Sequence, residues 1–256
     1  MGILNVTPDS FFDGGRYTNN NTVLQRVEQM LLDGATFIDV GGYSSKPNAT
    51  PVTAQEEKIR TVPVVAAIMQ HFPEAILSID TFRSDVAQLC LDQGAAIVND
   101  ISAGLLDSVM LKVVANYQVP YIMMHLKGTP QTMTTLTQYD NLIKEVLLYF
   151  SERVAAARSF AISDLIVDPG FGFAKTIEQN FEVLKHLNAL KMLELPILAG
   201  ISRKSMIHKT LQVTPEEALN GTTVLNTIAL QKGAAILRVH DVKEAVEAIK
   251  LWQKID

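Results

Sequence analysis

Several polar side chains with chemical capability stand directly after short apolar segments. The clearest case is the segment 165–175, L-I-V-D-P-G-F-G-F-A-K, in which an apolar run ends on Asp168 and a turn follows. The run has the length of a buried strand, and the proline and glycines after it end that strand. Because α/β proteins bind ligands at the carboxyl ends of their strands, Asp168 is a candidate site residue. The alternative is that Asp168 only caps the next helix.

The same arrangement recurs along the whole chain. The polar residues that close the predicted strands are Asn5, Asp39, Asp80, Asn99, His125, Asp168, the segment 202–204 and the segment 238–240. A carboxylate accepts two adjacent N–H groups, and an asparagine amide both donates and accepts. Asp80, Asn99 and Asp168 therefore suit the edge of a flat, amide-bearing heterocycle. For His125, core packing and ligand contact are equal alternatives.

A second set of strand-end residues is basic and hydroxylated. It consists of S-R-K-S at 202–205 and R-V-H at 238–240, which follow the last two predicted strands. Barrel enzymes commonly hold phosphate groups at this place. In a chain of net charge −5, this local cluster predicts a site for a small anionic ligand. The alternative for Arg203 and Lys204 is a solvated basic pair.

Three copies of one helix-turn-strand pattern predict the elements that position these residues. Segments 32–40, 91–99 and 230–238 each read as a helix end, a glycine suited to a left-handed cap, and a buried strand that closes on a polar residue. Such alternation indicates a parallel sheet. The chain carries about eight such strands and about eight helices, with no linker-like composition. We predict α/β class and a (β/α)8 TIM barrel, as a single domain over residues 1–256.

Composition narrows the class of protein further. Hydrophobic residues make up 48% of the chain and charged residues 19%, which is typical of a full globular core. The acidic balance argues against nucleic acid or a membrane surface as partner. A single cysteine, Cys90, excludes an intrachain disulfide and fits a reducing compartment. With no spanning apolar run and no basic leader before Met1, we expect a cytoplasmic protein.

The ordered motifs resemble those of dihydropteroate synthase, and the resemblance covers nearly the whole chain. They are M-G-I-L-N-V-T-P-D-S-F at 1–11, G-G-x-S at 41–44, I-D-T at 79–81, N-D-I at 99–101, M-H-x-x-G-x-P-x-T-M at 124–133, D-P-G-F-G-F at 168–173, S-R-K-S at 202–205 and R-V-H-D at 238–241. The resemblance implies condensation of a hydroxymethyl-dihydropterin diphosphate with 4-aminobenzoate, which gives dihydropteroate and diphosphate. It also implies sulfonamides as competing ligands, and we expect a homodimer because the last helix is apolar.

Carried over motif by motif, the resemblance implies a role for each site residue. Catalysis is expected of Asp80, Asp168, Lys204, Arg238 and His240. Pterin diphosphate binding is expected of Ser45, Asp80, Asn99, Asp168, Lys204, Arg238, Val239 and His240. Aminobenzoate binding is expected of Ser45, Pro47, Phe173 and Ser205. Asn5 is expected to help bind Mg²⁺ together with the diphosphate oxygens.

The chain departs from the family pattern in three places. The loop at 44–48 reads S-S-K-P-N where the family has S-T-R-P-G, and lysine lacks the planar fork of arginine. Phe12 stands where serine is common, and the segment that usually precedes the first strand is missing. We expect turnover to persist, with altered affinity on the aminobenzoate side. Two other functions compete: a pterin-binding methyltransferase domain, which needs no diphosphate site, and a non-catalytic pterin-binding paralogue.

Overall fold

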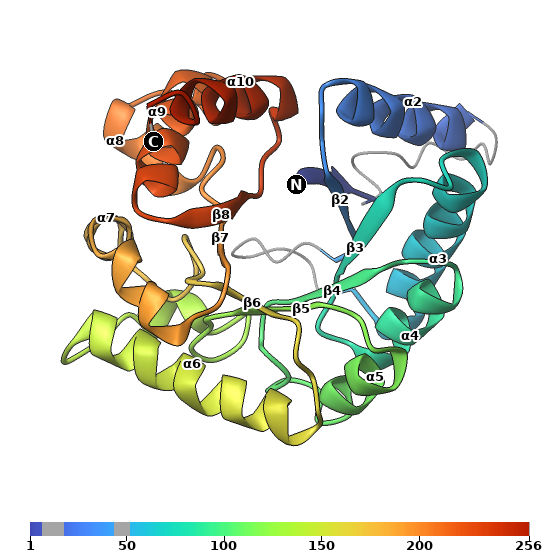
Figure 1. Ribbon diagram of the computed structural model, residues 1–256, viewed down its shortest axis with the longest axis horizontal. Coiled ribbons are helices and arrows are strands. Elements are labelled where there is room, and N and C mark those ends of the chain that lie inside the picture. Colours follow the sequence, from blue (N-terminus) through green and yellow to red (C-terminus); the bar gives the residue numbers. More distant parts are fainter. Residues whose placement is uncertain (7–17, 44–51, 256) are drawn as a thin grey trace.

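The structure is a computed structural model that describes residues 1–6, 18–43 and 52–255. Within these residues, eight parallel strands follow one another in chain order around a curled sheet, and helices lie on its outer side (Figure 1). The strands are β1 Gly2–Asn5, β2 Phe37–Gly41, β3 Ile76–Asp80, β4 Ile97–Asp100, β5 Tyr121–Met124, β6 Leu165–Asp168, β7 Ile197–Ala199 and β8 Ala234–Leu237. The α/β class and the eight parallel strands are confirmed.

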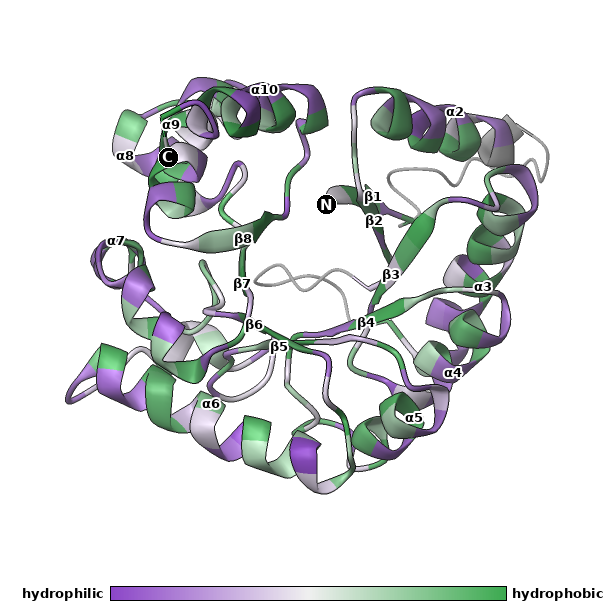
Figure 2. Ribbon diagram, in the orientation of Figure 1, coloured by the Kyte–Doolittle hydropathy of each residue, from purple (hydrophilic) through white to green (hydrophobic). Residues whose placement is uncertain are grey.

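The described helices follow the strands along the chain, and the last of them comes after β8. They are α2 Thr18–Leu32, α3 Ala54–His71, α4 Ser84–Asp92, α5 Met110–Tyr117, α6 Leu142–Ser159, α7 Ile177–Lys185, α8 Ser205–Leu211, α9 Leu219–Gln231 and α10 Val242–Trp252. There are also two 3₁₀ segments: η1 Met133–Thr135, between β5 and α6, and η2 Leu187–Leu193, between α7 and β7. Figure 2 shows hydrophobic colour along β3 and β4 and alternating hydrophobic and hydrophilic residues along α6. This is the pattern of strands covered by amphipathic helices.

The sheet curls until the chain after β8 meets β1. The backbone N–H of Ile3 donates to the carbonyl of Val239 at 2.9 Å, and the N–H of Val239 donates to the carbonyl of Met1 at 2.9 Å. The ladder is also thin between β6 and β7, where the register joins Val167 with Ile197 alone. The strand pair β7 and β8 is thus joined to its neighbours by few residues on both sides.

The repeated glycines have the conformation that the sequence predicts. Gly34, Gly94 and Gly233 follow helix ends and have φ of +96°, +99° and +101°, a region that favours glycine. A Cβ atom on Gly233 would also lie 2.0 Å from Cε of Lys191. These caps end each helix sharply and turn the chain directly into β2, β4 and β8.

Polar side chains form hydrogen bonds with the backbone just before α5 and α9. Helix α5 begins at Met110, and just before it the Asp107 carboxylate accepts the N–H groups of Ser84 at 2.7 Å and Val109 at 2.9 Å. Thr214 and Glu217 form reciprocal capping bonds at 3.0 and 3.3 Å, yet α9 begins only at Leu219. The sequence does not predict α8 at all.

Candidate active site

Alternation along the strands creates a polar layer at one end of the curled sheet. An apolar cluster fills the inside at the lower level and includes Phe37, Ile97, Ile122, Ile166, Leu198 and Ile236. Two positions later in four of these segments come Asp39, Asn99, Asp168 and Arg238. Side chains two positions apart share a face of a strand, so the polar groups lie one level above the apolar cluster. Residues far apart in sequence are thereby brought together.

Arg238 joins three of the strand ends. Its Nε donates to Oδ2 of Asp39 at 2.6 Å, and its Nη2 donates to Oδ2 of Asp80 at 2.6 Å. Asn99 donates its side-chain N–H to the same Asp39 oxygen at 3.0 Å. Asp39 is fully buried, and its other oxygen, Oδ1, has no hydrogen-bond partner among the described residues. One carboxylate oxygen therefore orients both an arginine and an asparagine.

Asp168 and Lys204 form the adjoining part of the site. A Cβ atom placed on Gly200 would lie 3.7 Å from Oδ2 of Asp168 and 3.9 Å from Nζ of Lys204 and from Cβ of Arg238. The Asp168 carboxylate, the Lys204 ammonium group and the base of the Arg238 side chain thus lie close together around Gly200. Oδ1 of Asp168 accepts the backbone N–H of Gly170 at 2.8 Å, which fixes the carboxylate at the start of its loop.

Burial shifts the ionisation of these groups. Burial raises the pKa of Asp80 to about 7, although the Arg238 guanidinium opposes the rise. Burial likewise raises the pKa of Asp168 against the opposing charge of Lys204, and it lowers the pKa of Lys204 to about 8 against the charge of Asp168. Burial also acts to lower the pKa of Arg238, but the Asp39 and Asp80 carboxylates outweigh it and the pKa is raised. The site therefore places weakened acids beside cations that persist at neutral pH.

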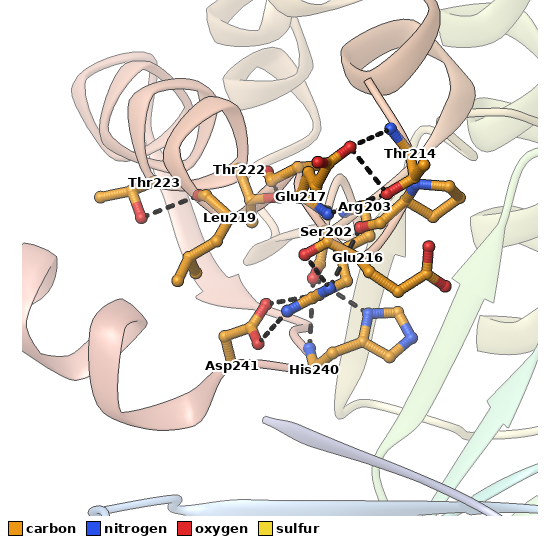
Figure 3. Close-up of polar contacts among 12 residues, drawn as sticks. Ser202, Arg203, Thr214, Glu216, Glu217, Leu219, Thr222, Thr223, His240 and Asp241 are labelled. Carbon is orange, nitrogen blue, oxygen red and sulfur yellow. Dashed lines mark hydrogen bonds and ion pairs between the residues drawn. The ribbon is translucent and has the colours of Figure 1, made fainter.

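The basic end of the site is built from the loops after β7 and β8. The Ser202 hydroxyl lies 3.0 Å from Nδ1 of His240 and accepts the backbone N–H of His240 at 3.2 Å. Arg203, in contrast, turns to Asp241, as Figure 3 shows, with bonds of 2.9 and 2.7 Å from its Nε and Nη2. The structure thus separates two residues that the motif S-R-K-S groups together. Arg203 is engaged in an ion pair, and Lys204 faces the site.

The loop after β6 is held from below by a buried lysine. Nζ of Lys175 contacts Nδ1 of His125 at 3.0 Å and donates to the carbonyls of Gly170 and Phe173, each at 3.1 Å. Burial lowers the pKa of Lys175 to about 7, and burial followed by the Lys175 charge lowers the pKa of His125 well below its ordinary value. His125 thus contacts Lys175 within a buried cluster beneath this loop, an observation that agrees with core packing.

The aromatic side chain of Phe173 lies beside the same lysine that approaches Asp168. Nζ of Lys204 stands 4.7 Å from the centre of the Phe173 ring and donates to the carbonyl of Phe171. Ser205 is the first residue of α8, immediately after Lys204. The predicted aminobenzoate residues of this loop and helix are therefore close to the predicted pterin residues.

The remaining predicted residues are placed less directly. Asn5 is exposed at the carboxyl end of β1. Val239 has a buried side chain, and both of its backbone groups pair with the chain around β1. Ser45 and Pro47 lie outside the described residues, as does the departure at Phe12. Their roles stay predictions.

Sequence reasoning gave no role to two residues that organise the site. Asp39 appears among the strand ends, but no motif marks it, and only the folded structure shows that it holds Arg238 and Asn99. Lys175 ends the loop after Asp168. The available signal for its role was a single lysine directly after a run of apolar and glycine residues. Among the described residues, no group of three or more His, Cys, Asp or Glu side chains is arranged to hold a metal ion.

Comparison with known proteins agrees with this site. A family model described as a pterin binding enzyme matches residues 1–240. A dihydropteroate synthase from Synechocystis sp. is 44% identical over 260 residues, covering 99% of this chain and 90% of that relative. A Yersinia pestis dihydropteroate synthase in complex with a sulfonamide drug has a TM-score of 0.92 at 41% identity, covering 99% of this chain and 92% of that chain. A Xanthomonas albilineans dihydropteroate synthase with 4-aminobenzoic acid has a TM-score of 0.91 at 38% identity, covering 99% and 91%.

The fold and the site together define a pterin-binding enzyme. The chain belongs to the dihydropteroate synthase family, transferases of folate biosynthesis, and the resemblance found in the motifs is confirmed. Among the described residues, no helix has both the length and the apolar character that crossing a bilayer requires.

Proposed function

We propose that the site condenses (7,8-dihydropterin-6-yl)methyl diphosphate with 4-aminobenzoate to give 7,8-dihydropteroate and diphosphate. The observation that carries this proposal is the convergence of acidic and amide groups with basic groups at one mouth of the sheet. Asp80, Asn99 and Asp168 offer acceptors and an amide for a flat ring, while Lys204 and Arg238 supply positive charge between them. A molecule with a ring and an anionic tail matches both halves.

Pterin binding requires Arg238 to exchange one partner for another. In the structure, Nη2 of Arg238 donates to Oδ2 of Asp80, an oxygen that we propose accepts a ring N–H group. The bond to the buried Asp39 can persist while the bond to Asp80 is released. The freed planar guanidinium can then stack on the ring and face the diphosphate, a geometry for which arginine is suited. Asp39 thus keeps Arg238 in the site in both arrangements.

The reaction breaks the C–O bond between the pterin methylene and the diphosphate and forms a C–N bond to the aminobenzoate. The bonding electrons leave with the diphosphate, and the attacking amine loses one proton to solvent. Arg238 and His240 stabilise the departing negative charge. Asp80 and Asp168 stabilise the positive charge that develops on the ring. The chemistry requires no covalent intermediate with the protein.

Mg²⁺ fits this arrangement as a partner of the diphosphate. Asn5 provides one exposed amide oxygen at the end of β1, and the described residues offer no acidic cage around it. Mg²⁺ characteristically keeps several waters and binds through few protein oxygens together with substrate phosphates. When bound, the ion would neutralise diphosphate charge. Asn5 would orient the ion through its side-chain oxygen.

The aminobenzoate is proposed to bind beside the pterin, over the loop after β6. Phe173 supplies an aromatic face and Ser205 a hydroxyl at the start of α8, and Lys204 links the two because its Nζ lies 4.7 Å from the Phe173 ring. Ser45 and Pro47, which lie outside the described residues, are proposed to bind aminobenzoate as well. The same subsite is proposed to accept sulfonamides, and the relative from Yersinia pestis was solved with such a drug.

Diphosphate release is the direct test of this function. The purified chain with both substrates and Mg²⁺ is expected to release diphosphate, and Asp168→Asn is expected to slow release by about 100-fold or more. The matched control is Asp85→Asn, whose carboxylate pairs with Lys58 on the surface at 2.6 Å. An intact chain that binds the pterin diphosphate without turnover would instead be a non-catalytic paralogue. Stabilisation by methyl-tetrahydrofolate but not by the pterin diphosphate would favour the methyltransferase reading.

Three features of the whole molecule belong to the same proposal. The bonds between Val239 and the β1 segment support a closed (β/α)8 barrel. The apolar face of α10 supports a homodimer. The single cysteine, Cys90, is buried and unpaired, which supports a reducing cytoplasmic location.

A further inference from the structure

The turn that carries the basic residues after β7 has an unusual occupant. The carbonyl of Ile201 accepts the backbone N–H of Lys204 at 3.1 Å and closes a four-residue turn. Arg203 occupies the third position of this turn with φ of +56°. That position in the left-handed region ordinarily favours glycine or asparagine. Arg203 therefore stands at a position whose backbone conformation does not favour a residue with a long side chain.

The Arg203 side chain forms four hydrogen bonds, which explain why an arginine stands at this position. Its Nε and Nη2 form a bidentate pair with the Asp241 carboxylate at 2.9 and 2.7 Å. Its Nη1 donates to the carbonyls of Pro215 and Glu216 at 3.1 and 2.8 Å. Figure 3 shows this fork, with Thr222 near the Arg203 backbone, whose N–H donates to the Thr222 hydroxyl at 3.1 Å. The guanidinium is thus committed to protein partners and does not face a ligand.

Asp241 also departs from the ordinary behaviour of its position. It is the N-cap residue of α10, yet its side chain forms no capping bond to that helix. An aspartate at an N-cap normally accepts an N–H group of the first helical turn. Here both carboxylate oxygens are occupied by Arg203 instead. The ion pair between Arg203 and Asp241 therefore joins two separate loops and takes the place of a capping bond from Asp241.

The contact joins the two loops that make up the basic end of the site. Ser202 and Lys204 flank Arg203 on one loop, and His240 precedes Asp241 on the other. Ser202 bonds to His240 both through Nδ1, at 3.0 Å, and through the backbone N–H, at 3.2 Å. A fixed fork on one side of these residues therefore limits their movement on the other.

We propose that Arg203 and Asp241 are positioning residues that set the spacing of Ser202, Lys204 and His240 for a diphosphate group. We call this pair the loop fork. The inference rests on the proposed function, because it assigns the loop fork to the anionic tail of the same substrate. It predicts that the loop fork affects binding of the tail and leaves recognition of the ring to Asp80, Asn99 and Asp168.

The test compares two ligands by calorimetry in the presence of Mg²⁺. Arg203→Gly is the main variant, since glycine tolerates the left-handed conformation and removes only the side chain. It is expected to weaken binding of the pterin diphosphate by about 10- to 100-fold, the range found when residues that orient binding groups are removed. Binding of 6-hydroxymethylpterin, which lacks the diphosphate, is expected to change less than about threefold. Equal losses for both ligands would overturn the proposal.

A second variant separates geometry from charge. Arg203→Lys retains the positive charge but loses the bidentate fork, so it is expected to weaken binding of the pterin diphosphate nearly as much as Arg203→Gly. Unchanged affinity in Arg203→Lys would show that charge alone matters and would overturn the loop fork. Asp241→Asn in the Arg203→Gly background is expected to add less than about twofold, because coupled residues are not additive.

Two controls keep the outcomes distinct. Lys58→Met removes a surface ion pair with Asp85 and is expected to leave both affinities unchanged. Diphosphate release by the unmodified chain is measured first: its absence counts against the proposed function. A wild-type chain with turnover, together with an Arg203→Gly variant of normal affinity and normal KM for the pterin diphosphate, counts against the loop fork alone.

Discussion

Arg238 is the residue on which the two halves of the site depend. It bonds to Asp39 and Asp80, and its Cβ lies near Gly200, as do the side chains of Asp168 and Lys204. Its pKa is raised despite burial because two carboxylates surround it, so it stays charged throughout the physiological range. Arg238 therefore supplies a permanent positive charge beside the Asp39 and Asp80 carboxylates.

Asp80 should make ring binding depend on pH. An ionised carboxylate can accept two ring N–H groups side by side, whereas a protonated one uses one oxygen as a donor, and burial raises the pKa of Asp80 to about 7. We therefore expect the affinity for 6-hydroxymethylpterin to fall by up to tenfold per pH unit as pH drops from about 7 to 5. Calorimetry across this range measures the slope. Because Asp80→Asn cannot titrate, a slope of the same size in that variant would contradict the assignment.

Lys175 should affect stability in the alkaline range. Its folded pKa of about 7 is depressed below the ordinary value of 10.5, so the unfolded chain binds more protons between these two values. The free energy of unfolding is expected to rise with pH from about 7 to 10.5, by at most about 1.4 kcal/mol per unit from this residue. The contribution is lost as pH falls through 7. Urea unfolding of the wild type and Lys175→Met, compared at several pH values, measures the difference.

At the scale of elements, a buried ion pair ties α3 to the turn before α4. Glu57 is fully buried, accepts the Thr81 hydroxyl at 2.6 Å and pairs with Arg83, whose Nη2 also donates to the carbonyl of Val52 at 2.6 Å. Thr81 directly follows Asp80. The pair therefore supports the end of β3 that carries a site residue.

Arg83→Met is expected to lower the free energy of unfolding by about 3 kcal/mol, because it leaves a buried carboxylate without its partner. Lys58→Met, which removes a surface pair of α3 and α4, is expected to cost less than about 1 kcal/mol. Urea denaturation compares the two. Adding Glu57→Gln to Arg83→Met should restore part of the loss, and equal losses in the two single variants would show that the buried pair has no special role.

The elements that could be predicted from sequence are those with strong local signals. Buried strands that end on polar residues and the glycine caps at 34, 94 and 233 required no knowledge of distant contacts. Helix α8 was missed because its seven residues span too little of the helical period to show a pattern. The role of Asp39 was missed for the opposite reason. Its partner Arg238 is 199 positions away, so only the folded chain brings them together.

At the scale of the whole molecule, an apolar groove lies between α9 and α10. It has a volume of about 940 Å³ and is lined by residues that include Leu219, Thr223, Ala248, Leu251 and Trp252. Leu251 is 73% exposed and Ile255 is 77% exposed. Exposed apolar side chains at a groove favour an interface between two copies.

Sedimentation equilibrium is expected to give a dimer for the wild type and a shift toward monomer for Leu251→Asp, since a charge in an apolar interface costs several kcal/mol. Leu32→Asp, at a similarly exposed position (77%) on α2, is the control and should stay dimeric. A wild-type chain that remains monomeric at all concentrations, or a dimer that Leu251→Asp leaves intact, would place any interface elsewhere.

Few backbone pairs join the strands β7 and β8 to the rest of the sheet, and this affects what ligand binding does to the stability of the sheet. Asp80 and Asn99, which we propose bind the ring, belong to one block of strands, and Lys204, Arg238 and His240 follow the strand pair β7 and β8, which is joined to this block by few residues. A bound molecule that touches both groups crosses the weakest joint of the sheet. Substrate affinity and the cohesion of the C-terminal quarter are therefore linked, so that each strengthens the other.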